Sequence, residues 1–149
     1  MLDLQTNWLG LVPYQEAFQR QLEVVQAQDG VARVWGLEHP AVITLGKRAV
    51  ESSDLKVPRA EIEKQGINIA VVDRGGEATL HSPGQLVIYP QIPLKEYHLG
   101  VKDYVERLTS ATESFLKECG VQTFRKTEPG LYTTNGKIVF FGLRIKKGM

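Results

Sequence analysis

The sequence has little of what marks secreted, membrane-spanning or nucleic-acid-binding proteins. Its one cysteine, Cys119, excludes an internal disulfide and a site made of several thiolates. No stretch approaches the roughly 20 consecutive apolar residues of a membrane-spanning helix, and the N-terminus is neither basic nor apolar enough for a signal peptide. Lys and Arg total 18 against 17 for Asp and Glu, which leaves no excess charge for broad binding to nucleic acid or to an anionic membrane. These absences predict a cytoplasmic protein that binds neither nucleic acid nor a membrane.

The composition that remains is typical of a folded domain. Hydrophobic residues make up 42% and charged residues 23% of the 149 residues, enough for one substantial core. No repeat, low-complexity tract or linker divides the chain. We therefore expect a single domain over residues 1–149.

Hydrophobic periodicity predicts helices and short strands in alternation. Helices are expected at residues 13–27, 58–65 and 101–118, and a surface loop at residues 47–57. Strands are expected at residues 31–37, 41–45, 67–72, 79–81, 85–89, 131–134 and 137–145, the last two joined by a type I′ turn at Asn135-Gly136. Because tight turns join neighbouring strands, most strand pairs should be antiparallel. The predicted class is α+β, a two-layer α/β arrangement in which helices pack on a mostly antiparallel mixed sheet.

The longest predicted helix carries a row of mostly apolar side chains at helical spacing. The row consists of Val101, Val105, Leu108, Thr112, Phe115 and Cys119. It predicts that Cys119 is buried, where a free cysteine behaves as a small hydrophobic residue and not as a nucleophile. The three histidines, His39, His81 and His98, are too scattered to form a metal site, so we expect no metal.

The segment with the most chemistry is the glycine-rich stretch from Asp73 to Pro90. Paired glycines allow backbone N–H groups to approach a ligand, and Arg74 at the end of an apolar strand offers a fixed fork of donors. His81 is suited to acid, base or orienting roles. The same residues are equally typical of a glycine-rich turn with a surface arginine and a structural histidine.

A second candidate is Lys137, which follows Asn135-Gly136 and begins an apolar strand. A lysine beside apolar residues at the mouth of a strand loses solvent, and loss of solvent lowers its pKa. The alternative is an ordinary, fully hydrated hairpin lysine, as most lysines are.

These segments together resemble the lipoyl(octanoyl) transferases, the lipoate-protein ligase B family. The family pattern Arg-Gly-Gly-x-x-Thr-x-His-x-Pro-Gly-Gln is met from Arg74 to Gln85, and Leu86-Val87-x-Tyr89-Pro90 continues it. Upstream, Glu38-His39-Pro40 and Thr44-Leu45-Gly46-Lys47-Arg48 are similar to a second family motif. Downstream, Pro129-Gly130-Leu131, Gly136-Lys137-Ile138 and Gly142-Leu143-Arg144-Ile145 are similar to the strand that carries the family's lysine. The resemblance runs from about Trp8 to the last residue.

The resemblance implies a biotin/lipoyl-ligase fold of the class II synthetase type and a reaction without a cofactor. The family moves an octanoyl group from acyl carrier protein to a lysine on lipoyl domains of 2-oxoacid dehydrogenases and on the H protein of the glycine-cleavage system. Lys137 would be the lysine that lowers the pKa of the nucleophile and serves in acid and base steps. The residues implied to line the acyl pocket are Arg74, Gly75, Gly76, Glu77, Ala78, Thr79, Leu80 and His81, with Phe140, Phe141 and Gly142 on the opposing wall.

One departure from the family pattern matters for activity. The family continues into a His-Gly-x-Ala-Leu-Asn segment and a Pro-Cys-Gly motif with the acyl-thioester cysteine, and the printed sequence contains neither. We therefore expect a fold incomplete at its C-terminus and a 149-residue chain that is inactive by itself. Two alternatives stay open: an ATP-dependent lipoate or biotin ligase, which Pro83-Gly84-Gln85 disfavours, and a non-catalytic module that binds acyl chains or carrier domains.

Overall fold

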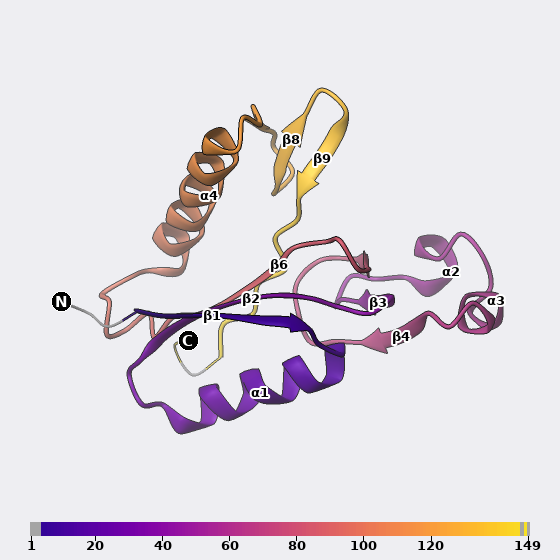
Figure 1. The fold of residues 1–149 in the computed structure, drawn as a ribbon, viewed down its shortest axis with the longest axis horizontal. Coiled ribbons are helices and arrows are strands. Elements are labelled where there is room, and N and C mark those ends of the chain that lie inside the picture. The colour runs from indigo at the N-terminus through magenta and orange to yellow at the C-terminus, as the bar shows by residue number, and fades with distance from the viewer. Residues whose placement is uncertain (1–3, 147, 149) are drawn as a thin grey trace. The chain divides into compact units, whose positions relative to one another are not determined.

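The computed structural model describes residues 4–146 and 148 and contains short strands and four helices among them (Figure 1). In chain order these are β1 (Leu4–Leu11), α1 (Tyr14–Ala27), β2 (Ala32–Glu38), β3 (Val42–Leu45), α2 (Glu51–Asp54), α3 (Arg59–Lys64), β4 (Asn68–Val71), β5 (Ala78–His81), β6 (Val87–Gln91), α4 (Val101–Glu118), β7 (Phe124–Arg125), β8 (Leu131–Thr133) and β9 (Gly136–Val139). None of the described helices is both long and apolar enough to cross a bilayer.

The chain forms two compact units. The first, here the N-terminal unit, runs to Pro93 and takes up the chain again from Leu143. The second, here the hairpin unit, spans Leu94–Gly142 and contains α4 with β7, β8 and β9. Both units combine helix with sheet, as the α+β class predicts; the described strand pairs of the hairpin unit are antiparallel, and those of the N-terminal unit are half parallel and half antiparallel.

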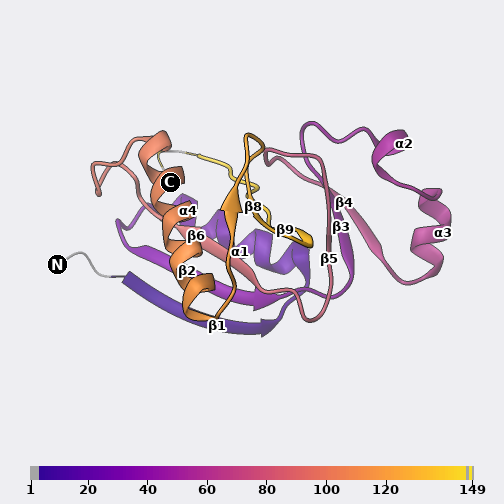
Figure 2. The same ribbon diagram turned by 90° about the horizontal axis from the view of Figure 1, so that it is seen from above.

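The core of the N-terminal unit lies between α1 and the sheet β1-β2-β6 (Figure 2). Strand β1 runs parallel to β2, and β6 runs antiparallel to it. Ala17 on α1 packs against Leu37 of β2 and Val87 of β6, and all three are buried with Val12. This burial supplies the hydrophobic stabilisation that holds the ends of β2 and β6 in place.

A second sheet of the N-terminal unit has the order β4-β3-β5. Strand β3 pairs in parallel with β4 and antiparallel with β5. Parallel neighbours require a long crossover, and here the crossover contains α2 and α3 (Figure 1). The loop from β4 to β5, residues 72–77, is the first part of the glycine-rich stretch and is here called the glycine loop; it begins and ends beside β3.

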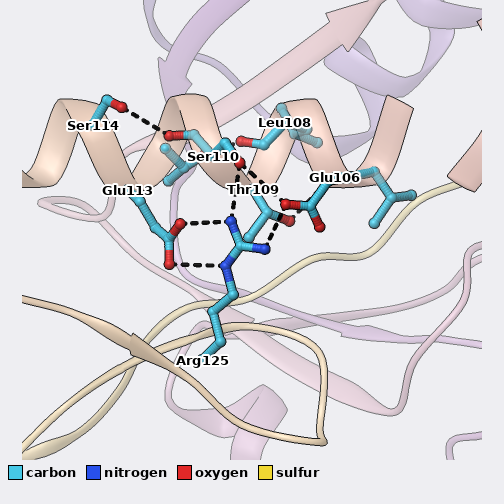
Figure 3. A network of polar contacts seen from close by, with 9 residues as sticks. Glu106, Leu108, Thr109, Ser110, Glu113, Ser114 and Arg125 are labelled. Atoms are coloured by element: carbon cyan, nitrogen blue, oxygen red, sulfur yellow. Dashed lines mark hydrogen bonds and ion pairs between the residues drawn. The ribbon is translucent and has the colours of Figure 1, made fainter. Parts of the chain in front are cut away.

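In the hairpin unit, one arginine fastens β7 to α4 (Figure 3). Arg125 donates from Nε and Nη2 to the two carboxylate oxygens of Glu113, at 2.9 and 2.6 Å, and from Nη1 to Glu106 at 2.6 Å. A further bond from Nη2 reaches Ser110 at 3.0 Å. The fork spans two helical turns and thus fixes the direction in which the chain leaves α4.

Most of the predicted elements are confirmed, and the additions have clear physical causes. Helix 101–118 is found with the predicted bounds, and four of the six strand pairs are antiparallel. Strand β1 was not predicted, because six of its eight residues are exposed and its sequence shows no alternation. Within the predicted loop 47–57, residues Glu51–Asp54 form one helical turn.

The predicted burial of Cys119 is wrong. Cys119 is exposed, as are Val101 and Phe115, whose side chains are 53% and 51% accessible. The buried side of α4 is centred instead on Tyr104 and Thr109. The ends of the apolar row thus lie outside the face of the helix that packs.

The predicted type I′ turn and long final strand are also wrong. Thr133 pairs with Gly136, so the two turn residues are Thr134 and Asn135, and neither has the positive φ that a type I′ turn requires. Gly136 follows the turn and has φ +129°. Strand β9 ends at Val139, and residues 140–146 have no regular structure.

Candidate functional site

Arg74 is held at the end of the β4-β3-β5 sheet by neutral oxygen acceptors. Its Nη2 donates to the side-chain oxygens of Thr44 and Thr79, at 2.6 and 2.9 Å, and to the Thr44 carbonyl at 3.1 Å. Its Nη1 donates to the Gly75 carbonyl at 2.9 Å. Thr44 and Thr79 face each other across the β3–β5 ladder, so the guanidinium closes the end of that strand pair.

The positive charge of Arg74 has no carboxylate bound to it among the described residues. The group is half-buried, and burial lowers the pKa of Arg74 against the opposing influence of Tyr14 and Tyr89. A guanidinium stays charged in proteins nevertheless. A half-buried cation with only neutral partners favours the approach of an anion or of a developing negative charge.

The glycine loop is fixed by backbone bonds to the chain that follows β3. The N–H groups of Gly46, Lys47 and Arg48 donate to the carbonyls of Glu77, Arg74 and Gly76, at 3.1, 3.0 and 3.1 Å. A Cβ at Gly46 would lie 2.8 Å from Nη1 of Arg74 and closer still to the carbonyl oxygen of Gly76. Gly46 is therefore required for the close approach of these two segments.

A cluster of aromatic and imidazole rings lies in the same unit. His39 is fully buried, its Nδ1 is 2.6 Å from the Val12 carbonyl, and its Nε2 is 2.9 Å from the Tyr89 hydroxyl. A carbonyl only accepts, so Nδ1 carries the proton and Nε2 accepts from Tyr89. Burial lowers the pKa of His39, so the ring is neutral, and burial also raises the pKa of Tyr89, which keeps its proton as the donor.

His81 is the second imidazole of this cluster. Its Nδ1 is 2.6 Å from the side-chain oxygen of Gln85, whose amide nitrogen donates to the Leu80 carbonyl at 3.1 Å. Burial lowers the pKa of His81 against the opposing effect of the hydrogen bond with Gln85, and the nearby charge of Arg74 adds to the lowering. The His81 ring lies 5.5 Å from the His39 ring and 6.5 Å from the Tyr14 ring. With Nδ1–H donated to Gln85, the Nε2 lone pair is the atom of His81 that can accept a proton.

A cluster of cations borders the glycine loop, and we call it the basic cluster. It consists of Lys47, Arg48, Arg144 and Lys146. Lys47 and Arg144 both pair with the carboxylate of Asp73 at 2.6 Å, and the charges of Arg144, Lys47 and Lys146 all help to lower the pKa of Asp73, after the hydrogen bond from Lys47. The Gly75 N–H donates to the Leu143 carbonyl at 3.3 Å, which brings the segment with Arg144 against the loop.

In the hairpin unit, Lys137 is enclosed by four residues that we call the Lys137 cradle: Glu128, Gly130, Tyr132 and Phe140. The Lys137 amine donates to Glu128 at 3.0 Å and lies 5.5 and 5.1 Å from the ring centres of Tyr132 and Phe140. Gly130, at φ +140°, lies so close to the lysine's Cε that a Cβ there would collide with it. The Lys137 side chain is only 19% exposed.

The expected lowering of the Lys137 pKa is wrong. Burial does lower the pKa of Lys137, but the hydrogen bonds with Glu128 and Tyr132 and the charge of Glu128 outweigh it, so the net shift is upward. The fully hydrated alternative does not hold either, since the side chain is mostly enclosed. Lys137 is a partly buried cation with a counter-ion, an arrangement that matches neither expectation.

The predicted site residues are divided between the two units. Arg74, Thr79 and His81 point their polar atoms into the network around β3 and β5, whereas Leu80 and Glu77 are exposed. Lys137, Phe140, Phe141 and Gly142 belong to the hairpin unit, and Phe140 is 59% exposed. No three His, Cys, Asp or Glu side chains of the described chain converge on a metal position.

Five residues of these networks were not singled out from the sequence. They are Tyr14, Thr44, Gln85, Tyr89 and Glu128. Thr44 and Tyr89 lie within the family motifs and within strands of the site. A correct alignment of the paired strands would therefore have identified them. No sequence pattern marks Glu128 as a partner of Lys137, because a lone glutamate near a turn looks like any solvent-exposed charge.

This chain is similar to known proteins in three comparisons, by family model, by sequence and by fold. A family model described as the lipoyl protein ligase A/B catalytic domain matches residues 13–149. An octanoyltransferase from Marinomonas sp. is 35% identical, over 99% of this chain and 67% of its own length, and one from Hydrogenovibrio crunogenus is 37% identical, over 98% and 69%. The chain thus spans about two thirds of the length of these curated relatives.

The fold comparison adds a solved structure of distant sequence. A bi-partite lipoate protein ligase from Thermoplasma acidophilum superposes with a TM-score of 0.66 at 14% identity, over 95% of this chain and 55% of that chain. This confirms the predicted biotin/lipoyl-ligase type of fold.

Gly46→Ala is expected to destabilise the N-terminal unit, because the added methyl group would press on the Gly76 carbonyl and on Arg74. The expected loss is about 1–3 kcal/mol of unfolding free energy, as for other overpacked sites, measured by urea denaturation. Gly75→Ala is the matched control, since its Cβ would meet the Leu143 carbonyl at an ordinary 3.6 Å. Equal stability of the two variants would contradict the close approach described here.

The buried histidines are expected to make folding stability fall in mild acid. Because the pKa of His39 is lowered from 6.5 in the folded state, the unfolded chain takes up the proton first as the pH falls below 6.5, and the folded state loses stability until the lowered pKa is passed. His39→Gln should reduce this slope in the pH range below 6.5, measured by urea unfolding at a series of pH values. His98→Gln, in an exposed loop, is the control, and an unchanged slope in His39→Gln would refute the assignment.

Proposed function

The chain belongs to the lipoyl protein ligase A/B catalytic domain family, and from that membership we propose that it transfers an octanoyl group from an acyl carrier protein to a lysine of a lipoyl domain. The observation that carries the proposal is the 35% and 37% identity to octanoyltransferases over nearly the whole chain. The acceptors we propose are the lipoyl domains of 2-oxoacid dehydrogenases and the H protein of glycine cleavage. The reaction belongs to protein lipoylation.

The chemistry that we propose is acyl transfer through a cysteine thioester. A thiolate attacks the carbonyl carbon of the octanoyl thioester, the carbon–sulfur bond to the carrier breaks, and the carrier sulfur leaves as a thiolate. The acceptor lysine then attacks the enzyme thioester, an amide bond forms, and its surplus proton returns to the released cysteine. Negative charge develops on the octanoyl oxygen in both steps, so each needs a nearby cation or N–H donor.

Arg74 and the glycine loop supply the first set of such donors. The guanidinium is fixed by Thr44 and Thr79 and has neutral partners only, so it is preorganised to stabilise negative charge without moving. The N–H of Gly75 is used by Leu143. We therefore assign the electrostatic role to the arginine and a shaping role to the two glycines.

Lys137 supplies the second cation. A free cysteine has a pKa of about 8.5, so only a few per cent is thiolate at neutral pH. A cation within about 4–6 Å lowers such a pKa by about one to three units, which makes the thiolate the dominant form. The pairing with Glu128 keeps Lys137 protonated, which suits this electrostatic role.

The basic cluster supports an acidic carrier as the acyl donor. With Arg74 it places five cations near the glycine loop against the carboxylates of Asp73 and Glu77, a local charge of +3 in a chain whose total is +1. Such a concentration attracts an acidic protein and accelerates its association.

The proposal is tested in a protein that carries these 149 residues together with the family's Pro-Cys-Gly segment. We expect mass spectrometry to show octanoyl transfer from octanoyl-carrier protein to a lipoyl domain without ATP. Transfer that requires ATP and free octanoate would contradict the proposal and favour a ligase, and binding without transfer would favour a non-catalytic module.

In the same protein, Lys137→Ala is expected to reduce transfer at neutral pH by about 10²-fold or more, because the thiolate loses its cation. Lys137→Arg keeps the charge and should recover part of the rate. The measurement is a pH–rate profile, and Lys117→Ala on α4 is the control. A wild-type rate for Lys137→Ala at pH 7 would exclude a catalytic role for this lysine.

Cys119 is expected to take no part in the reaction. It lies exposed at the end of α4, and Cys119→Ser should therefore keep the wild-type transfer rate. We also expect no octanoyl group on Cys119 after incubation of the 149-residue chain with octanoyl-carrier protein. An adduct on its tryptic peptide would overturn this assignment.

Charge reversal in the basic cluster is expected to weaken binding of the carrier. Arg48→Glu with Lys146→Glu should raise the dissociation constant for acyl carrier protein about tenfold or more at low salt, with a smaller effect at high salt. The double variant Lys64→Glu with Lys102→Glu changes the net charge equally at other surfaces and is the control. Titration calorimetry distinguishes them, and equal weakening by both would show that only total charge matters.

A further inference from the structure

The carboxylate of Glu128 joins two groups of the hairpin unit. One oxygen accepts from the Lys137 amine at 3.0 Å, and the other accepts from the Tyr132 hydroxyl at 3.0 Å. Glu128 precedes β8, Tyr132 lies within β8 and Lys137 lies within β9, so the carboxylate bridges the two strands of the hairpin from outside its ladder. Both oxygens are used, which fixes the orientation of the carboxylate.

The lysine is enclosed while its counter-ion is open to solvent. The Lys137 side chain is 19% exposed and the Glu128 side chain is 71% exposed. The rings of Tyr132 and Phe140 and the backbone at Gly130 surround the stem and amine of the lysine. Nothing in that enclosure except Glu128 is a full negative charge among the described residues. The amine therefore depends on one exposed carboxylate.

A second cation makes that dependence stronger. The Lys126 amine lies 4.5 Å from the centre of the Tyr132 ring, which Lys137 approaches at 5.5 Å. The groups around the Lys137 amine are thus the Glu128 carboxylate and the rings of Tyr132 and Phe140, and the Lys126 ammonium lies near the same Tyr132 ring. Without Glu128, two ammonium groups would share one aromatic ring with no anion between them.

We infer that Glu128 is a positioning residue that holds the Lys137 amine in place as a fixed cation. Lys137 then presents its positive charge at one position in the hairpin unit. The catalytic significance of this inference rests on the proposed function. The pairing of Glu128 with Lys137 rests only on the contacts within the hairpin unit.

The balance of forces on Lys137 supports this inference. Burial lowers the pKa of Lys137, and the hydrogen bonds and charge of Glu128, with those of Tyr132, raise it above its ordinary value. Glu128→Gln keeps an oxygen acceptor of similar size but removes the charge. Burial then acts with less opposition, so the pKa of Lys137 should fall.

The experiment measures the protonation of Lys137 directly and needs no transfer activity. The protein is treated briefly with acetic anhydride over a range of pH, and acetylation of Lys137 and of Lys126 is followed by mass spectrometry of their peptides. We expect the midpoint of the Lys137 profile to fall by about one pH unit in Glu128→Gln, a tenfold change in the protonation equilibrium. Glu128→Asp should restore part of the shift because the charge returns.

Glu118→Gln, at the exposed end of α4, is the matched control and should leave the Lys137 midpoint unchanged. The midpoint reports protonation, whereas a merely looser hairpin would change the rate at every pH. An unchanged midpoint in Glu128→Gln would overturn the inference. If the midpoint falls but the protein transfers no octanoyl group, the inference stands and the proposed function fails.

Discussion

The guanidinium of Arg74 is the group on which the arrangement of the candidate site depends. It reaches back across the end of the β4-β3-β5 sheet to Thr44 and Thr79, and it bonds the Gly75 carbonyl of its own loop. Because these acceptors come from both strands of the β3–β5 pair, the arginine joins the sheet end to the glycine loop. Gly46 permits this by leaving room for the Gly76 carbonyl and for Nη1 of Arg74. These bonds thus hold the glycine loop rigidly at the end of the sheet, with the positive charge of Arg74 at a fixed position.

Arg74 in the N-terminal unit and Lys137 in the hairpin unit have different kinds of surroundings. In the N-terminal unit, burial keeps His39 neutral and Tyr89 protonated, so the cation of Arg74 is surrounded by neutral dipoles. In the hairpin unit, Lys137 is enclosed by rings but retains an exposed carboxylate partner. Neutral dipoles leave a charge available to a ligand, whereas a counter-ion holds a charge in one protonation state. The first arrangement suits electrostatic stabilisation of substrate, and the second suits a permanent cation.

Sequence patterns predicted the parts of the fold that depend on local periodicity and missed those that depend on tertiary surroundings. Helix 101–118 was predicted with its correct bounds because its apolar spacing and stop signals are local. Strand β1 was missed because most of its side chains are exposed, and Cys119 was misplaced because the facing of a helix depends on what covers it. The Arg74 motif was recognised, but the raised pKa of Lys137 was not, since a single carboxylate nine residues away decides its sign.

The most direct test of this account is the stability of Arg74→Lys against wild type, measured by urea unfolding of the whole chain. Lysine keeps the charge but cannot reach Thr44, Thr79 and Gly75 at once, because it lacks the planar fork. The account predicts a loss of about 1.5 kcal/mol or more, the value of at least one hydrogen bond to a charged group. A variant as stable as wild type would show that Arg74 does not join the strand end to the loop, and the central interaction would have to be abandoned.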